Sequence, residues 1–162
     1  MDEFETRNVL GSHAGLHKLC ATYFTLSCMP PDFRSNIQNI FVCLLFHSDD
    51  RNNFKNESVF YLLIEDLVEL SSNGLNFEST TFSCTVYFQT ALLLGDNLGL
   101  HQMIGFNESF SSNYSCRICE VPKADMYSRC EENERLIRSE ELYEDAIPID
   151  DPSKTGIKEL SI

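Results

Sequence analysis

Positive charge is scarce in this sequence: its 162 residues include 12 Lys and Arg against 25 Asp and Glu, a formal net charge of −13. Proteins that hold nucleic acids by charge carry a concentrated basic footprint. The composition excludes such a footprint over the bulk of the surface, so we expect this chain to bind duplex DNA poorly. A nucleic-acid role would need local basic residues, a bound cation or further sequence.

Long apolar runs are absent as well. No run approaches the roughly 20 residues that cross a bilayer, so we expect no membrane association. No positively charged, apolar leader opens the sequence, and the seven cysteines are an odd number at irregular positions. These features predict a reducing, intracellular compartment and cysteines that are not joined in disulfides.

The residues that are present suffice for one globular domain, because 43% of them are hydrophobic. We expect this domain at residues 1–119 and an acidic tail at residues 120–162. The tail holds 12 acidic and 6 basic residues, three X-Pro breaks and little apolar periodicity. It is predicted to be helical over residues 124–144 and extended afterwards.

Two apolar stretches predict strands in the first half of the chain. Residues 17–27 alternate and are rich in Tyr, Phe, Thr and Leu, which favours a strand. Two prolines in residues 28–36 predict a loop. Residues 37–47 are best interpreted as a second strand entering the core, with a buried helix as the alternative. A polar turn is expected at residues 49–53.

Residues 58–72 change to a helical period. The apolar positions recur every three or four residues: Phe60, Leu63, Leu67 and Leu70. This spacing predicts an amphipathic helix. Asn56 can cap its start, and Asn73 with Gly74 can end it.

A third apolar run follows a short piece at residues 75–78. It covers residues 85–96 and ends in "LLLGD", which Asn97 follows. The run is typical of a strand covered on both faces. It would place Asp96 at the end of a strand, where α/β proteins usually carry their chemistry. The alternative is that Asp96 caps a short helix formed by residues 97–106. The predicted order is therefore strand, strand, helix, strand and acidic residue.

Two motifs, "DEFETRNVLGSHAGLHKL" at residues 2–19 and "VYFQTALLLGDNLGLHQMIGFNESFSSNYSCRIC" at residues 86–119, carry a resemblance to a known group. The chain resembles transposon-encoded proteins similar to transposases of the KDZ and CACTA type. In that group "GDNLGLHxxLGFxESFxxNxxCRxC" is common, as is a downstream "TGIK", which here occupies residues 155–158. The likeness covers almost the whole chain.

The resemblance implies an α/β fold with an RNase H-like mixed sheet and flanking helices. In that fold a first strand bearing an aspartate lies beside a later strand ending in a second one, with two antiparallel strands and a helix between them. On this basis Asp2 and Asp96 are the candidate catalytic residues. They are also the candidate ligands for Mg²⁺ or Mn²⁺, because hard oxygen ligands suit these ions. Two such ions would support DNA strand cleavage and transfer.

We expect the core to be incomplete relative to that family. Most of the family's first strand precedes the residue that is Asp2 here, and the family's His-Asp pair and third acid follow "TGIK". The chain is therefore expected to be truncated at both ends and inactive by itself, with the missing regions carrying DNA contacts. A nuclear location is implied by the family alone.

Cys116 and Cys119 have the spacing of half a tetrahedral zinc site, because two thiolates three residues apart can bind one ion from a turn. The other half could come from Cys130, His101 or His13, or from beyond the chain. Zn²⁺ is therefore a second candidate cofactor.

Three hypotheses follow for the function. The first is a fragment or domesticated remnant of a DNA transposase. The second is a non-catalytic interaction module whose acidic tail, residues 120–162, binds a basic protein partner. The third is a product of a faulty gene model that does not fold stably alone.

Overall fold

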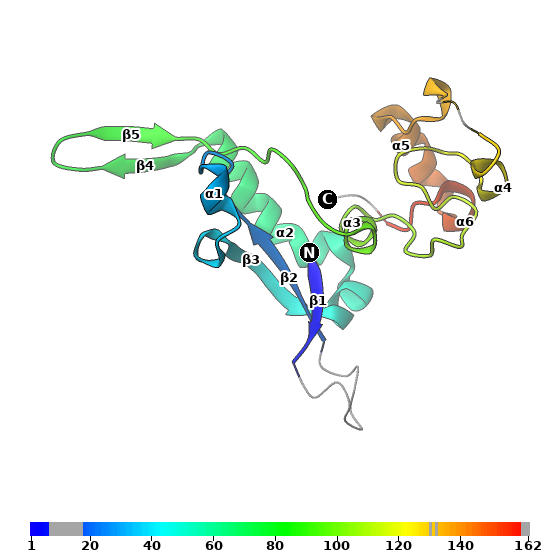
Figure 1. Ribbon diagram of the computed structural model, residues 1–162, viewed down its shortest axis with the longest axis horizontal. Helices are drawn as coiled ribbons and strands as arrows, with labels where there is room; N and C mark the ends of the chain where they lie inside the picture. The colour runs from blue at the N-terminus through cyan, green and yellow to red at the C-terminus, as the bar shows by residue number, and fades with distance from the viewer. Residues whose placement is uncertain (7–17, 130, 132, 160–162) are drawn as a thin grey trace. The chain divides into compact units, whose positions relative to one another are not determined.

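The computed structural model describes residues 1–6, 18–129, 131 and 133–159 (Figure 1). The chain divides into two compact units, Met1–Leu94 and Gly95–Ile162. Helices and strands both occur, so the expected mixture of α and β structure is confirmed. Both sheets formed by the described residues are antiparallel, whereas a mixed sheet was expected. No helix in the described part of the chain is long and apolar enough to cross a membrane.

The first unit contains a three-stranded sheet in the order β1-β2-β3. Its strands are β1 (Asp2–Glu5), β2 (Lys18–Phe24) and β3 (Phe41–His47). The strands predicted at residues 17–27 and 37–47 are thereby confirmed, the second against its helical alternative. Both pairings are antiparallel, and β2 lies between the other two strands.

The loop predicted between these strands is partly helical. It contains α1 (Pro31–Arg34) and a 3-10 turn, η1 (Ile37–Asn39). Proline suits the first turn of a helix because the amide it lacks would be unpaired there anyway. Arg34 Nε donates a hydrogen bond to the carbonyl of Met29 at 2.7 Å. This bond joins the end of α1 to the start of the loop.

The helix α2 (Ser48–Ser72) begins ten residues earlier than its apolar period indicated. The polar turn expected at residues 49–53 is therefore wrong. The reason is a capping box: the amide of Asp49 donates to His47 Nδ1 at 3.3 Å, and the amide of His47 donates to Asp50 at 3.0 Å. Acidic residues in the first turn also favour the positive end of the helix dipole.

The predicted limits of the second part of α2 correspond to features of its backbone. Lys55, next to the predicted cap Asn56, has φ 68° and ψ 164°, which breaks the helix. At the other end, the amides of Asn73 and Gly74 both donate to the carbonyl of Glu69. Gly74 has a φ of +68°, which glycine adopts without a steric penalty. The helix therefore ends where it was predicted to end.

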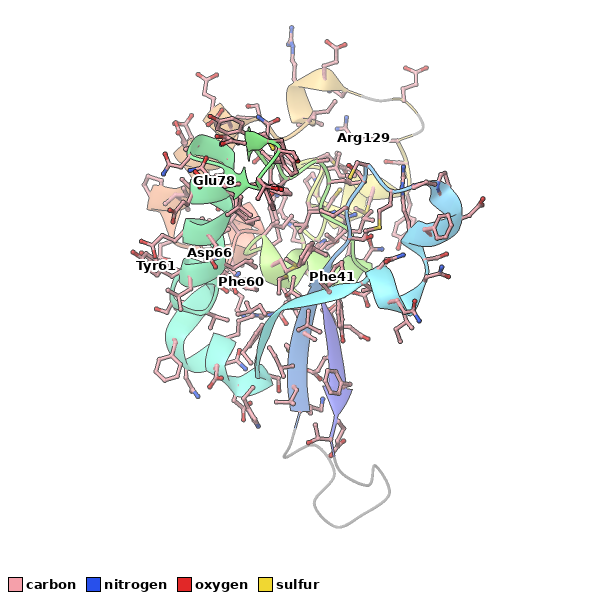
Figure 2. The ribbon with its side chains drawn as sticks, turned by 90° about the vertical axis from the view of Figure 1, so that its left-hand side faces the viewer. Phe41, Phe60, Tyr61, Asp66, Glu78 and Arg129 are labelled. Atoms are coloured by element: carbon pink, nitrogen blue, oxygen red, sulfur yellow. The ribbon has the colours of Figure 1, made fainter. Side chains whose placement is uncertain are left out.

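One side of α2 packs on the three-stranded sheet. Phe60 is fully buried, and its ring meets that of Phe46 edge-on at 5.7 Å between centroids. Tyr61 lies on the outer side of the helix (Figure 2). Among the described residues of this unit, the other buried hydrophobic side chains are those of Cys20 and Ala21 in β2.

The apolar run at residues 85–96 is not the buried strand that was predicted. Among the residues that the structure describes, strand β5 (Ser83–Val86) pairs with β4 (Leu75–Glu78) alone, and residues 87–96 have no regular structure. Leu92 and Leu94 are each 72% exposed. The amide of Phe88 donates instead to the carbonyl of Leu70 at the end of α2, which leads the chain out of the hairpin. A strand needs backbone partners as well as an apolar sequence.

The second unit consists of short helices. They are α3 (Asn97–Met103), α4 (Lys123–Met126), η2 (Glu134–Leu136), α5 (Glu140–Ala146), η3 (Ile147–Ile149) and α6 (Pro152–Thr155). The continuous helix predicted over residues 124–144 is therefore wrong. Asn133 and Ser139 interrupt it, because each side chain caps a new turn by accepting an amide hydrogen bond, from Arg135 and Leu142 respectively.

Residues 146–157, expected to be an extended tail, contribute to the core of this unit. Phe106, Ala146 and Ile157 are each 7% exposed and form one cluster, flanked by Ile104 and Tyr143. Phe106 and Ile157 also share an antiparallel bridge. The predicted boundary after residue 119 falls inside this unit.

Candidate functional site

Asp96 caps helix α3. Its Oδ1 accepts a hydrogen bond from the amide of Gly99 at 2.6 Å, and its backbone is extended, as an N-cap residue requires. The side chain is exposed. Asp96 therefore has the alternative role, that of a helix cap. It does not lie at the end of a strand.

The two candidate catalytic aspartates occupy different units. Asp2 is the first residue of β1, stands opposite Ala21 and is exposed. Asp96 lies in the second unit. Neither unit by itself therefore contains both aspartates.

Cys116 and Cys119 are brought together in a bend of the second unit. The amide of Ile118 donates to Cys116 Sγ at 3.3 Å, and Cys119 lies near enough to affect the pKa of the Cys116 thiol. Cys119 then pairs with Ile137 in an antiparallel bridge. Both cysteines are partly exposed. The two cysteines therefore lie in one bend, and their use as zinc ligands stays a prediction.

Arg138 fixes this bend from inside the unit. Its side chain is 6% exposed and reaches three oxygen acceptors: the carbonyl of Cys116 at 3.2 Å, Glu120 at 3.2 Å and the carbonyl of Thr155 at 2.7 Å. The guanidinium also lies 5.0 Å from the centroid of the Phe106 ring, a cation–π distance. Arg138 thereby connects the cysteine bend to the hydrophobic cluster.

The two thiols differ in acidity. Burial raises the pKa of the Cys116 thiol, but the amides of Ile118 and Cys119, the Cys119 thiol and the charge of Arg138 outweigh it and hold the pKa below the ordinary value. For Cys119, burial and the neighbouring Cys116 raise the pKa above the ordinary value. Cys116 is therefore the thiol more readily ionised.

Arg117, between the cysteines, connects the bend to the residue after the aspartate. Its guanidinium donates to Asn97 Oδ1 at 2.9 Å. The "GDN" and "CRIC" motifs are thus joined through one hydrogen bond in the second unit.

The remaining zinc-ligand candidates do not complete a site in the described part of the chain. His101 is 2% exposed, lies 2.8 Å through Nδ1 from the carbonyl of Asn107, and packs against the rings of Phe106 and Phe110. His13 and Cys130 lie outside the described residues. Over the described ranges, no group of three or more His, Cys, Asp and Glu side chains is arranged to hold a metal ion.

Arg138 was missed by the sequence reasoning, because a single arginine 22 residues from Cys116 belongs to no spacing pattern. Its burial depends on the folding of the second unit as a whole. Comparison with known proteins adds no further residues: no protein-family model, curated protein or solved structure matches this chain.

Proposed function

We propose that this chain is a fragment or domesticated remnant of a transposase-like protein, ancestrally an enzyme of metal-dependent DNA cleavage and transfer, and that it is inactive by itself. The observation that carries the proposal is the order of elements. Strands β1, β2 and β3 lie side by side and antiparallel, α2 follows, and the "GDNLGLH" motif with Asp96 comes after the separate β4–β5 hairpin. In an RNase H-like core, antiparallel strands followed by a helix also lie between the first two acidic residues.

The role of Asp96 in this structure supports the proposed inactivity. The Asp96 carboxylate serves as a helix cap, and the apolar run before it is not a strand. Asp2 and Asp96 lie in different units, so we assign the Mg²⁺ or Mn²⁺ chemistry to the ancestral enzyme and derive no catalytic step from it.

The test is a DNA-nicking assay with Mg²⁺ or Mn²⁺, together with a calorimetric titration of the same ions. We expect neither nicking nor saturable binding by the wild-type chain. The matched variant is Asp96→Asn, because asparagine keeps the helix cap and removes the negative charge. Cation-dependent nicking that disappears in Asp96→Asn would overturn the proposed inactivity. Saturable binding lost in that variant would show that Asp96 still contributes to a metal site.

A zinc role for Cys116 and Cys119 is a separate part of the proposal. Their partly exposed sulfurs converge, and the Cys116 sulfur accepts an amide hydrogen bond, as a thiolate ligand does. They would supply two of the four ligands of a Zn²⁺ ion. Cobalt substitution tests this, since thiolate ligation gives intense charge-transfer absorption. We expect that absorption in the wild type and its loss in Cys116→Ser. Its absence from the wild type would exclude the site.

The second candidate function is an interaction module that binds a basic protein partner. Helix α5 favours it, because four of its acids are exposed to solvent: Glu140, Glu141, Glu144 and Asp145. Removal of residues 120–162 would delete Ala146 and Ile157 from the core, so the test is neutralisation of the four acids to Gln and Asn. We expect loss of partner capture in a pull-down, with Asp96→Asn unaffected. Unchanged capture by the neutralised variant would exclude α5.

A DNA-handling ancestry also implies a nuclear location. Fluorescence microscopy of the tagged chain tests it, and uniform exclusion from the nucleus would count against it.

A further inference from the structure

We propose that Cys116 and Cys119 form a reversible dithiol–disulfide pair that exchanges with low-molecular-weight disulfides such as oxidised glutathione. This bend would then be a redox-responsive modification site. The inference goes beyond the proposed function, because it requires neither DNA nor a bound metal ion.

The first support is the closeness of the two thiols within one bend. The Ile118 amide donates to Cys116 Sγ at 3.3 Å, and the two thiols are near enough for each to shift the pKa of the other. A disulfide forms without large backbone movement only where the side chains already point toward each other. The reduced bend meets that requirement.

The second support is that the bend is held on both sides. The amide of Arg138 donates to the carbonyl of Ile118 at 2.9 Å, and the amide of Glu120 donates to the carbonyl of Leu136 at 2.7 Å. The Arg138 side chain holds the carbonyl of Cys116 at 3.2 Å. The cysteines therefore lose little conformational freedom when they are joined, which favours the intramolecular disulfide over two mixed disulfides.

The third support is access. Both cysteines are partly exposed, whereas Cys20 is buried. A small disulfide can therefore reach the bend from solvent. It cannot reach Cys20, which is buried.

The reaction proceeds in two exchanges. The Cys116 thiolate attacks one sulfur of the small disulfide, which breaks the S–S bond and releases one small thiol with the proton that Cys116 lost. The Cys119 sulfur then attacks Cys116 in the mixed disulfide, gives up its own proton and releases the second small thiol. The protein loses two electrons and two protons, and the small disulfide gains both.

The experiment equilibrates the full-length chain with mixtures of reduced and oxidised glutathione, with a metal chelator present so that bound ions do not mask the thiols. Remaining thiols are alkylated, and peptide mass spectrometry locates the disulfides. We expect a Cys116–Cys119 disulfide that forms with an equilibrium constant about tenfold or more above that of the same residues in urea. In Cys119→Ser we expect a persistent glutathione adduct on Cys116.

The matched control is Cys28→Ser, since Cys28 is exposed in the first unit. It should leave the Cys116–Cys119 equilibrium unchanged. Two results would overturn the proposal: glutathione adducts on Cys28 and Cys84 with no disulfide at the bend, or the same equilibrium constant in the native and the urea-treated chain. The second result would mean that sequence spacing alone, and not the folded bend, joins the cysteines.

Discussion

Asp96 of the "GDN" motif has two possible roles, as a helix cap and as a metal ligand. Its Oδ1 accepts the amide of Gly99 at 2.6 Å. An asparagine side chain can accept the same hydrogen bond, whereas alanine cannot. Neutralising the charge and removing the cap are therefore separable at this position.

For stability, we predict that Asp96→Ala lowers the free energy of unfolding of the second unit by about 1 kcal/mol, whereas Asp96→Asn changes it by only a few tenths. Urea denaturation in metal-free buffer measures both variants. If asparagine destabilised the unit as much as alanine, the negative charge itself would be required and capping would not be the role of Asp96.

Asp151 provides a prediction about pH. Hydrogen bonds from Ser153 and the ion pair with Lys154 at 3.0 Å lower the pKa of this carboxyl from 3.8 to about 2. A depressed pKa means that the folded state favours the ionised form. Its stabilising contribution is therefore complete above pH 4 and is lost as the pH falls toward 2.

A carboxyl-carbon NMR titration of Asp151 is expected to give a midpoint near the lower of these two values. Lys154→Ala should move the midpoint upward, because the ion pair is one of the causes of the shift. A midpoint at the ordinary aspartate value in the wild type would show that these contacts do not form in solution.

At the residue scale the sequence could indicate only local arrangements. The residue before a short helix is a natural cap, which was the alternative for Asp96 and is the arrangement found, whereas the zinc role of Cys116 and Cys119 stays a prediction. Arg138 could not be found in this way. Its hydrogen-bond partners Cys116 and Thr155 are distant in sequence, so its role depends on tertiary structure.

At the scale of elements, α2 contains a strained point. Lys55 has φ 68° and ψ 164°, a region that is essentially restricted to glycine. Arg51, Asn56 and Phe60, on either side of it, are buried. The packing of these side chains holds the backbone in this conformation.

We predict that Lys55→Gly stabilises the first unit by about 1 kcal/mol, because relief of the strain exceeds the extra entropy of glycine in the unfolded chain. Lys55→Ala is the control, since alanine removes the long side chain but retains the strain. Urea denaturation compares the two. Destabilisation by Lys55→Gly, or equal stabilisation by both variants, would contradict the assignment of strain to this residue.

Elements were predictable where the sequence pattern and backbone pairing agree. Strands β2 and β3 and the end of α2 followed from alternation, helical period and an Asn-Gly stop signal. The run at residues 85–96 was misassigned, because hydrophobicity predicts burial but supplies no hydrogen-bonding neighbour. The first turns of α2 were missed because the same polar residues that form turns also cap helices.

At the scale of the whole chain, each unit has its own small core. Phe60 occupies the first, and Phe106 the second. The described residues that are buried and hydrophobic number seven in total, so each aromatic ring supplies a large part of its unit's burial.

We therefore predict reciprocal effects of two truncations. Phe60→Ala should destabilise the first unit by about 3–5 kcal/mol, and Phe106→Ala the second by a similar amount. Amide hydrogen exchange read by mass spectrometry should show lost protection in β2 and β3 for the first variant and around Ile157 for the second. Loss of protection throughout the chain in both variants would mean that the two units unfold as one.

The bridge between Phe106 and Ile157 has a consequence for the order of events during synthesis. Lys158 and Glu108, beside it, are joined at 2.7 Å across a separation of 50 residues. The first unit, by contrast, has its sheet and covering helix complete at Ser72. On the ribosome the sheet can therefore form while the second unit is still being translated. The second core closes only after Ile157 has left the exit tunnel, so the nascent chain must keep Phe106 uncovered for the time taken to add roughly fifty residues, several seconds at typical rates of synthesis.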